Sequence, residues 1–111
     1  MSERSSAVLI QDILDSIRSI QLYTEGMSAQ SFLEDPKTRD AVVMHFIVIG
    51  EASSRIPEDF KILHDQIPWN EMRGLRNRIA HDYFGIDYEI VWDIIQEKFE
   101  SLALQIRAIT T

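Results

Sequence analysis

The stretch AVVMHFIVIG, residues 41–50, is the longest apolar run in the sequence and decides how the chain can fold. It is interrupted by His45 and is far shorter than the roughly 20 residues that a membrane-spanning helix needs. Upstream, Asp35 and Pro36 form a pair that is typical of a helix cap followed by the first helical position. We therefore expect a helix over about residues 36–55, apolar around much of its circumference and the most buried element of the protein.

Helical spacing of apolar residues continues on the N-terminal side of this segment. Residues 6–25 carry apolar side chains at helical spacing, and Gly26 would end a helix there. The side chains expected to face the core are Ile10, Ile13, Leu14, Ile17 and Ile20.

The C-terminal half of the sequence predicts three more helices. Residues 57–67 can form one short helix, and Pro68 opens a longer one that reaches about Tyr83. The pattern then breaks, and Asp87 is suited to cap a last helix over about residues 88–108. The inward side chains of that helix are expected to be Ile90, Val91, Ile94, Ile95, Phe99 and Leu102.

The sequence contains no alternating strand pattern and no hairpin turn signal, so the fold class that we predict is all-α. Residues 1–111 would form one domain, an antiparallel bundle of four main helices plus a short extra helix. Apolar surface that remains uncovered in such a bundle often forms a dimer interface.

The composition is typical of a globular protein in a reducing compartment. Apolar residues make up 45% of the 111 residues and charged residues 26%, and there is no cysteine for a disulfide or a thiolate metal site. The polar start MSERSS is not followed by an apolar signal region, so we expect a cytoplasmic protein without a membrane segment. The formal net charge of −7 argues against a protein that holds nucleic acid along a broad basic face.

The stretch RGLRNRIAHDY, residues 73–83, departs from this acidic background. From Arg73 to His81 it has three arginines and no acid, so it carries +3 while the rest of the chain carries −10. A contact with nucleic acid would therefore be small, sensitive to salt and centred on this segment. The alternative is a cluster of charges that simply faces solvent.

The spacing within this segment determines which side chains can act together on a helix. Arg76 and Tyr83 are seven residues apart and point within about 20° of each other, while Asn77 and His81 are four apart on one face. Arg76 and His81 differ in direction by about 140°, so one straight helix does not aim both at one atom. A long arginine that swings round, a helix that frays near His81, or a second copy across a two-fold axis would bring them together. The second copy needs no distortion.

Arginine and histidine without metal ligands are suited to cleaving RNA. A neutral imidazole can take the proton from a ribose 2′-OH, which then attacks the adjacent phosphate. A guanidinium can hold that phosphate and stabilise the added charge of the transition state. The products would be a 2′,3′-cyclic phosphate and a 5′-hydroxyl, and the reaction requires no ion or other cofactor.

Other polar residues of the segment have more than one interpretation. Arg73 and Arg78 either contact the RNA backbone, pair with Glu71 or Asp82, or are solvated. Asn77 either orients the histidine, binds phosphate or caps a neighbouring helix.

Glu51 is a carboxylate within the apolar second helix, where it needs a partner if it is buried. An arginine of the 73–83 segment is the natural partner, which would make Glu51 a supporting residue of the site, and solvent exposure is the alternative. His45 and His64 have no histidine or carboxylate four residues further on, so we expect both to be structural and expect no metal site.

The segment RNRIAHDY resembles the R-x4-H-x-Y signature of the HEPN superfamily, and specifically of the HepT-like toxins. Arg76, His81 and Tyr83 occupy its three positions, and Asn77 fits the polar residue that follows the arginine. The surroundings also resemble this family, namely FLEDPKTRDAV at 32–42, IGEA at 49–52, IPWNEMRGLRN at 67–77 and GIDYEIVW at 85–92. The resemblance covers nearly the whole chain.

This resemblance implies an all-helical homodimer whose active cleft lies at the two-fold interface. The implied activity is a metal-independent RNase with Arg76 and His81 as the catalytic pair, and tRNA is the substrate expected at family level. HepT-like proteins are the toxin half of toxin–antitoxin pairs, of a type II or type VII kind, and their partner is a minimal nucleotidyltransferase of the MntA type. In characterised systems this partner adds AMP to the tyrosine of H-x-Y, here Tyr83, which would block the phosphate site by occupation and charge. A packing role at the end of the helix is the alternative for Tyr83.

Two other interpretations of the chain remain. It could be a non-catalytic helical module that binds a nucleotidyltransferase and its nucleotide or substrate, with the arginines holding phosphate without cutting. It could also be a purely structural dimerising bundle, which leaves the charge asymmetry unexplained. A short nucleotidyltransferase in the neighbouring reading frame would favour the toxin and the binding module over the structural bundle.

Overall fold

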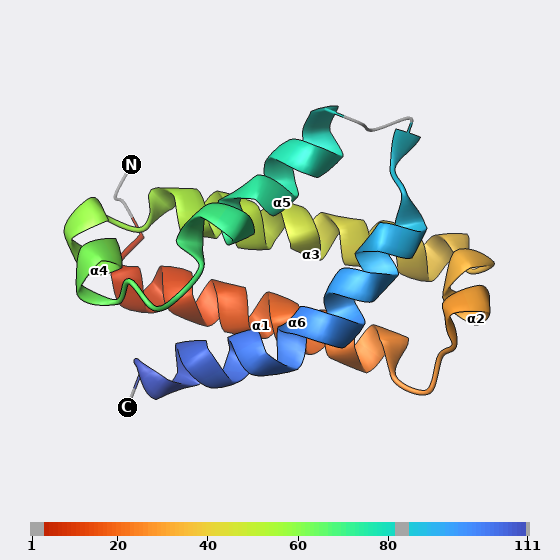
Figure 1. Cartoon of the computed structure of the whole chain (residues 1–111), viewed down its shortest axis with the longest axis horizontal. Coiled ribbons are helices and arrows are strands. Elements are labelled where there is room, and N and C mark those ends of the chain that lie inside the picture. The colour runs from red at the N-terminus through yellow and green to blue at the C-terminus, as the bar shows by residue number, and fades with distance from the viewer. Residues whose placement is uncertain (1–3, 82–84, 111) are drawn as a thin grey trace.

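The computed structural model describes residues 4–81 and 85–110, and at residues 78–81 it describes the backbone alone. In these ranges the chain forms helices and no strands. They are α1 (Ser6–Thr24), α2 (Ala29–Leu33), α3 (Pro36–Arg55), α4 (Glu58–Leu63), α5 (Trp69–His81) and α6 (Tyr88–Ala108). The longer helices α1, α3, α5 and α6 run in alternating directions along the molecule (Figure 1). The predicted all-α antiparallel bundle is therefore confirmed. The helix predicted to start at Pro68 was expected to end near Tyr83, and that end lies outside the described residues.

The helix ends use the caps that the sequence predicts. Asp35 accepts a hydrogen bond from the Thr38 backbone N–H at 3.1 Å and one from the Thr38 hydroxyl at 2.8 Å. Because these bonds favour its charged form, the pKa of the Asp35 carboxyl is lowered. Asp87 caps α6 through the backbone N–H groups of the next helical turn. Gly26 follows α1 with φ +77°, a conformation that residues with a Cβ rarely adopt.

The short helix α2 is absent from the sequence prediction, because five residues are too few for an apolar period to emerge. Its start is a capping box, in which Ser28 and Ser31 exchange hydrogen bonds between side chain and backbone at 3.1 and 2.9 Å. Phe32 is fully buried, and its ring centroid lies 5.3 Å from that of Trp92 on α6. In the described part of the chain, the bundle therefore has two short helices where one was expected.

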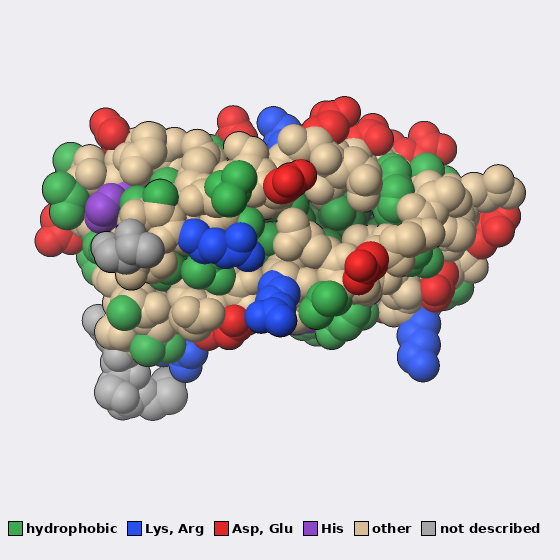
Figure 2. Space-filling view, turned by 90° about the horizontal axis from the view of Figure 1, so that it is seen from below, with side chains coloured by type: hydrophobic (Ala, Val, Ile, Leu, Met, Phe, Trp, Pro, Cys, Tyr) green, Lys and Arg blue, Asp and Glu red, His purple; other side chains and the backbone are tan. Residues whose placement is uncertain are grey.

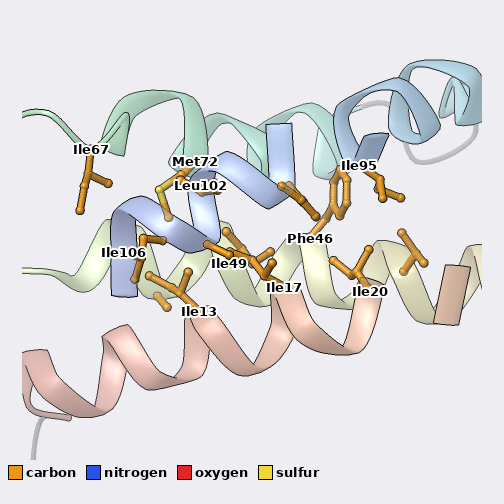
Figure 3. Packing of buried hydrophobic residues seen from close by; sticks show 14 of the residues in the cluster. Ile13, Ile17, Ile20, Phe46, Ile49, Ile67, Met72, Ile95, Leu102 and Ile106 are labelled. Atoms are coloured by element: carbon orange, nitrogen blue, oxygen red, sulfur yellow. The ribbon is translucent and has the colours of Figure 1, made fainter. Parts of the chain in front are cut away.

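The core lies where α3 packs between its neighbours. α3 contacts α1 along one side and α5 along another, and α6 packs on α1. Figure 3 shows apolar side chains of these helices, and Ile67 from the connection before α5, meeting in one cluster; the labelled ones are Ile13, Ile17, Ile20, Phe46, Ile49, Ile67, Met72, Ile95, Leu102 and Ile106. The predicted apolar helix over residues 36–55 thus contributes to this cluster through Val42, Phe46 and Ile49.

Three side chains predicted to point inward depart from that prediction. Leu14 and Ile94 are only partly buried, and Ile90 is 40% exposed, so its assignment to the core is wrong. For the two residues of α6, the physical reason is that α5 packs mainly on α3, so that among the described residues one side of α6 stays open. Ile94 lines an open groove between α5 and α6, and Ile90 lies one helical turn before it.

Candidate active site

Helices α3 and α5 cross where Gly50 meets Arg76. A Cβ on Gly50 would lie 2.8 Å from the backbone nitrogen of Arg76 and even closer to its Cβ, so only glycine lets the two backbones approach this far. Earlier in α5, Trp69 and Met72 are buried and hold the first half of the helix on the bundle. Packing therefore fixes the point from which the Arg76 side chain starts.

A carboxylate of α3 meets this arginine. Glu51 Oε2 lies 3.0 Å from Nε of Arg76, and the side chains of the arginine and the glutamate are 46% and 38% exposed. The predicted pairing of Glu51 with an arginine of the 73–83 segment is therefore present. The alternative prediction, that Glu51 is exposed to solvent, is also partly correct, because the ion pair is only half buried.

A second arginine shares the same carboxylate. Arg55, at the end of α3, donates from Nε and Nη2 to Glu51 Oε1 at 3.3 and 3.2 Å. Each oxygen of Glu51 thus contacts a different guanidinium group, and the cluster of three residues keeps one net positive charge. Such exposed pairs are weak, typically worth about 0–1 kcal/mol, so an incoming anion can compete with them.

The neighbouring residues of the segment lie on the surface of α5. Arg73 is exposed and lines a polar pocket of about 420 Å³ between α4 and α5, together with Lys61 and Asn70. Among the described residues Arg73 has no ion pair with Glu71, so that predicted alternative is not present. Asn77 is exposed, and the side-chain caps that the structure describes for α1, α2, α3 and α6 come from other residues.

The histidine of the segment is the last residue of α5. The backbone is helical through His81, so the predicted possibility that the helix frays there is not seen up to this residue. Toward this end, α5 rises away from α3 (Figure 1). The side chains of Arg78 and His81 lie outside the described residues, as do Asp82 and Tyr83, so their predicted roles remain predictions.

The two other histidines make contacts within the bundle, as expected of structural residues. His45 Nδ1 lies 3.1 Å from the buried Ser16 hydroxyl and its ring packs against Tyr23, while burial lowers the pKa of His45. The His64 ring packs against Phe60. Over residues 4–81 and 85–110, no three His, Cys, Asp or Glu side chains gather as a metal ion would require.

The surface offers no basic strip on the face drawn in Figure 2, where cationic and acidic side chains are scattered among apolar ones. The larger cavity, a mostly apolar groove of about 530 Å³, lies between α5 and α6 and is lined by Met72, Leu75 and Leu102 among others. Within the described ranges, no helix combines the length and hydropathy needed to cross a membrane. Glu51 and its two arginines form a local cationic cluster at the crossing of α3 and α5.

The sequence interpretation missed two residues of this crossing, Gly50 and Arg55. For Arg55 a signal existed, because it follows Glu51 by four residues and so shares its helix face. For Gly50 the signal was a glycine inside an otherwise helical, apolar run, which often marks a close approach of another backbone.

The chain is an all-helical bundle in which an arginine lies at a helix crossing and a histidine follows it on the same helix. The sequence matches the family described as "Ribonuclease HepT-like" over residues 13–109. The chain belongs to the HepT-like ribonuclease family, which confirms the expected family and, at that level, the expected ribonuclease class.

Individual relatives cover most of the chain. A protein of Thermococcus cleftensis named as a probable ribonuclease HepT is 41% identical over 100 residues, which span 90% of this chain and 91% of that one. A candidate RNase of Methanocaldococcus jannaschii is 42% identical over 98 residues, or 88% of this chain and 81% of its own. A second candidate RNase of that organism is 35% identical over 98% of this chain and its own full length. No solved structure matches the chain at a significant level.

Proposed function

We propose that this chain is a metal-independent endoribonuclease in which Arg76 and His81 form the catalytic pair. The observation that carries the proposal is the seating of Arg76, whose backbone packs on Gly50 and whose Nε contacts Glu51 at 3.0 Å. An arginine held in this way is preorganised for an anion, as a phosphate-binding residue of an enzyme needs to be. The names of the relatives support RNA as the substrate.

In the proposed reaction, neutral His81 removes the proton from a ribose 2′-OH. The 2′-oxygen bonds to the adjacent phosphorus while the bond from phosphorus to the 5′-oxygen breaks, and the leaving 5′-oxygen takes up a proton from water. Arg76 binds the phosphate through its terminal nitrogens, because its Nε faces Glu51. The products are a 2′,3′-cyclic phosphate and a 5′-hydroxyl. Arg73, Asn77 and Arg78 would support the site by contacting the RNA backbone.

The test is cleavage of RNA by the purified chain in the presence of EDTA, with the ends of the products identified. The wild-type chain should leave cyclic phosphates, and Arg76→Ala and His81→Ala should each lose at least about 10²-fold in rate. Activity that survives either change, or that disappears with the chelator, contradicts the proposal. Phosphate-dependent binding of RNA without any cleavage would support the non-catalytic module instead.

The active form that we propose is a homodimer with its cleft at the two-fold axis. The spacing of the motif supports this. The backbone of α5 is helical through His81, so His81 lies about 140° around the helix axis from Arg76, and one copy does not aim both residues at one atom. Apolar side chains on the uncovered side of α6, including Ile90 at 40% and Leu104 at 60% exposure, suit a contact with a second copy.

A mixture of two inactive variants tests this arrangement. If each cleft takes Arg76 from one copy and His81 from the other, a heterodimer of Arg76→Ala and His81→Ala contains one intact cleft. Activity should then appear after the two inactive proteins are unfolded and refolded together. A mixture that stays inactive, while the wild-type chain recovers from the same treatment, contradicts a shared cleft.

In the cell, we propose, the chain is a cytoplasmic toxin that a minimal nucleotidyltransferase of the MntA type neutralises by adding AMP to Tyr83. Tyr83 follows Arg76 by seven residues, so on a continuous helix the two positions share a face. An anionic nucleotide there would occupy and neutralise the phosphate site. The intact mass of the chain co-expressed with the nucleotidyltransferase should increase by one or more AMP units, and Tyr83→Phe should abolish the increase. An unchanged mass contradicts this regulation, and so does a mass increase that persists in Tyr83→Phe.

A further inference from the structure

Two arginines from different helices contact one carboxylate at the crossing of α3 and α5. Arg55 of α3 donates to Glu51 Oε1, and Arg76 of α5 contacts Glu51 Oε2. The motif that points to Arg76 does not include Arg55, and the two residues are 21 positions apart in the sequence. The fold alone brings them together.

This sharing limits how far apart the two guanidinium groups can be. Each lies one ion-pair contact from the same carboxylate, at 3.2 Å for Arg55 and 3.0 Å for Arg76. Arg55 is therefore within reach of the phosphate that follows one bound by Arg76 in a polynucleotide. Arg55 is also the more accessible of the two, with 62% of its side chain exposed against 46% for Arg76.

We propose that Arg55 is an RNA-binding residue that contacts the phosphate next to the one cleaved, and that Glu51 positions both arginines. The inference rests on the proposed function of Arg76. In the free protein the carboxylate holds both guanidinium groups near their binding positions, and the weak exposed pairs leave them able to turn toward RNA. The site thus prefers a substrate with at least two successive phosphates over one with a single phosphate.

A purely structural role is the competing explanation for Arg55. It lies in the last turn of α3, where a cation favours the helix dipole, and it pairs with Glu51 at the spacing of one helical turn. That role predicts a small loss of stability in Arg55→Ala and no effect on RNA. The two explanations therefore differ in readouts that involve RNA.

The first measurement is binding of a short single-stranded RNA at a series of salt concentrations, in a His81→Ala background that does not cleave it. Each phosphate contact to a single strand adds about 0.7 to the slope of log K against log salt. Arg55→Ala should reduce that slope by about 0.7 and weaken binding roughly ten-fold, and Arg55→Lys should restore most of both. Arg18→Ala is the matched control, because Arg18 is exposed on α1, which packs on α3 and α6 rather than on α5.

The second measurement is cleavage kinetics with Arg55 changed in the otherwise wild-type chain. Arg55→Ala should raise KM for an oligonucleotide roughly ten-fold with little change in kcat, and should leave cleavage of a dinucleotide with one phosphate unaltered. The proposal is overturned if Arg55→Ala has the same salt slope and the same KM as Arg18→Ala. It is also overturned if Arg55→Ala slows cleavage of the oligonucleotide and of the dinucleotide equally. If the wild-type chain cuts RNA while these results fail, the proposed function stands and only the role of Arg55 falls.

Discussion

The two sides of α3 use different chemistry. On the side that faces the core, Val42, Phe46 and Ile49 are at most 1% exposed and pack against apolar side chains. On the side that faces α5, Gly50 packs against the backbone of Arg76, and Glu51 forms a half-exposed charged cluster with Arg55 and Arg76. The difference teaches that the apolar core and the charged groups of the candidate site lie on different sides of one helix, so that the ion pairs can be changed with limited effect on stability, whereas Gly50 at the crossing serves both.

Phe46→Ala should give the largest effect on stability, because it empties the core side of α3. Phe46 is 1% exposed and its ring lies 5.4 Å from that of Phe99 on α6. Its removal should cost about 3–5 kcal/mol in the free energy of unfolding, measured by urea denaturation. Met44→Ala, two residues away and 59% exposed in the native chain, is the control that should change little. Similar losses for both variants would show that the core side of α3 is not distinct.

Gly50→Ala should give the next largest effect, because it forces apart the crossing of α3 and α5. The added Cβ would meet the backbone of Arg76 at 2.8 Å, and overpacking of this kind costs about 1–3 kcal/mol. Displacing Arg76 should also reduce RNA cleavage, by about 10²-fold for a shift near 1 Å. The measurements are urea denaturation and cleavage rate on the same preparations.

Gly74→Ala is the matched control for the stability part of that prediction. Gly74 also lies inside a helix, on the α5 side of the crossing, but an added Cβ there meets nothing within 4 Å. This change should stabilise the chain by roughly 0.5–1 kcal/mol, because alanine favours the helix over glycine. Equal effects of the two glycine changes would contradict the tight crossing at Gly50.

The fold could be predicted from the sequence because its determinants are local. Asp35 and Asp87 each mark the start of a helix through hydrogen bonds to residues within three positions, and Gly26 marks the end of one through its positive φ. The partner of Glu51 could also be predicted, because an acid in an apolar helix calls for a cation and the 73–83 segment is where cations concentrate.

What could not be predicted depends on where helices cross. Periodicity says which face of α6 is apolar, but only the path of α5 decides that Ile90 is left exposed and Ile94 lines a groove. The same holds for Gly50 and Arg55, whose roles exist only because α5 meets α3 one residue before Glu51. A motif along one helix does not say where a second helix crosses it.

Glu51→Gln should affect activity more than stability, since it breaks the ion pairs on the side of α3 that faces α5. These pairs are exposed, so the free energy of unfolding should change by less than about 1 kcal/mol. Without the carboxylate the arginines stay cationic but are no longer held, so kcat should fall about ten-fold, while KM should rise less than in Arg55→Ala because Arg55 keeps its charge. Glu100→Gln, an exposed change on α6, is the control. A rise in KM at unchanged kcat would mean that Glu51 acts on substrate binding and not on the position of Arg76.

His45 should give the smallest effect, and it tests a polar contact between α1 and α3. Its Nδ1 lies 3.1 Å from the hydroxyl of Ser16, which is 3% exposed, and burial lowers the pKa of His45. Since the pKa is lower in the folded chain than in the unfolded one, the unfolded chain binds the proton first as the pH falls. The stability contributed by neutral His45 is therefore complete above the unfolded pKa, near 6.5, and is lost as the pH decreases through the folded pKa.

The free energies of unfolding of the wild-type chain and of His45→Gln at pH 8 and pH 5 measure this contribution. Carboxylates titrate equally in both proteins, so the difference between the two chains isolates the histidine. The wild-type chain should lose slightly more stability between pH 8 and pH 5 than His45→Gln does, whereas Ser16→Ala should lower stability at pH 8 by removing the hydrogen bond. Parallel losses in the wild-type chain and His45→Gln would show that the core side of α3 tolerates a charged imidazole, and that the two sides of the helix are less different than the packing indicates.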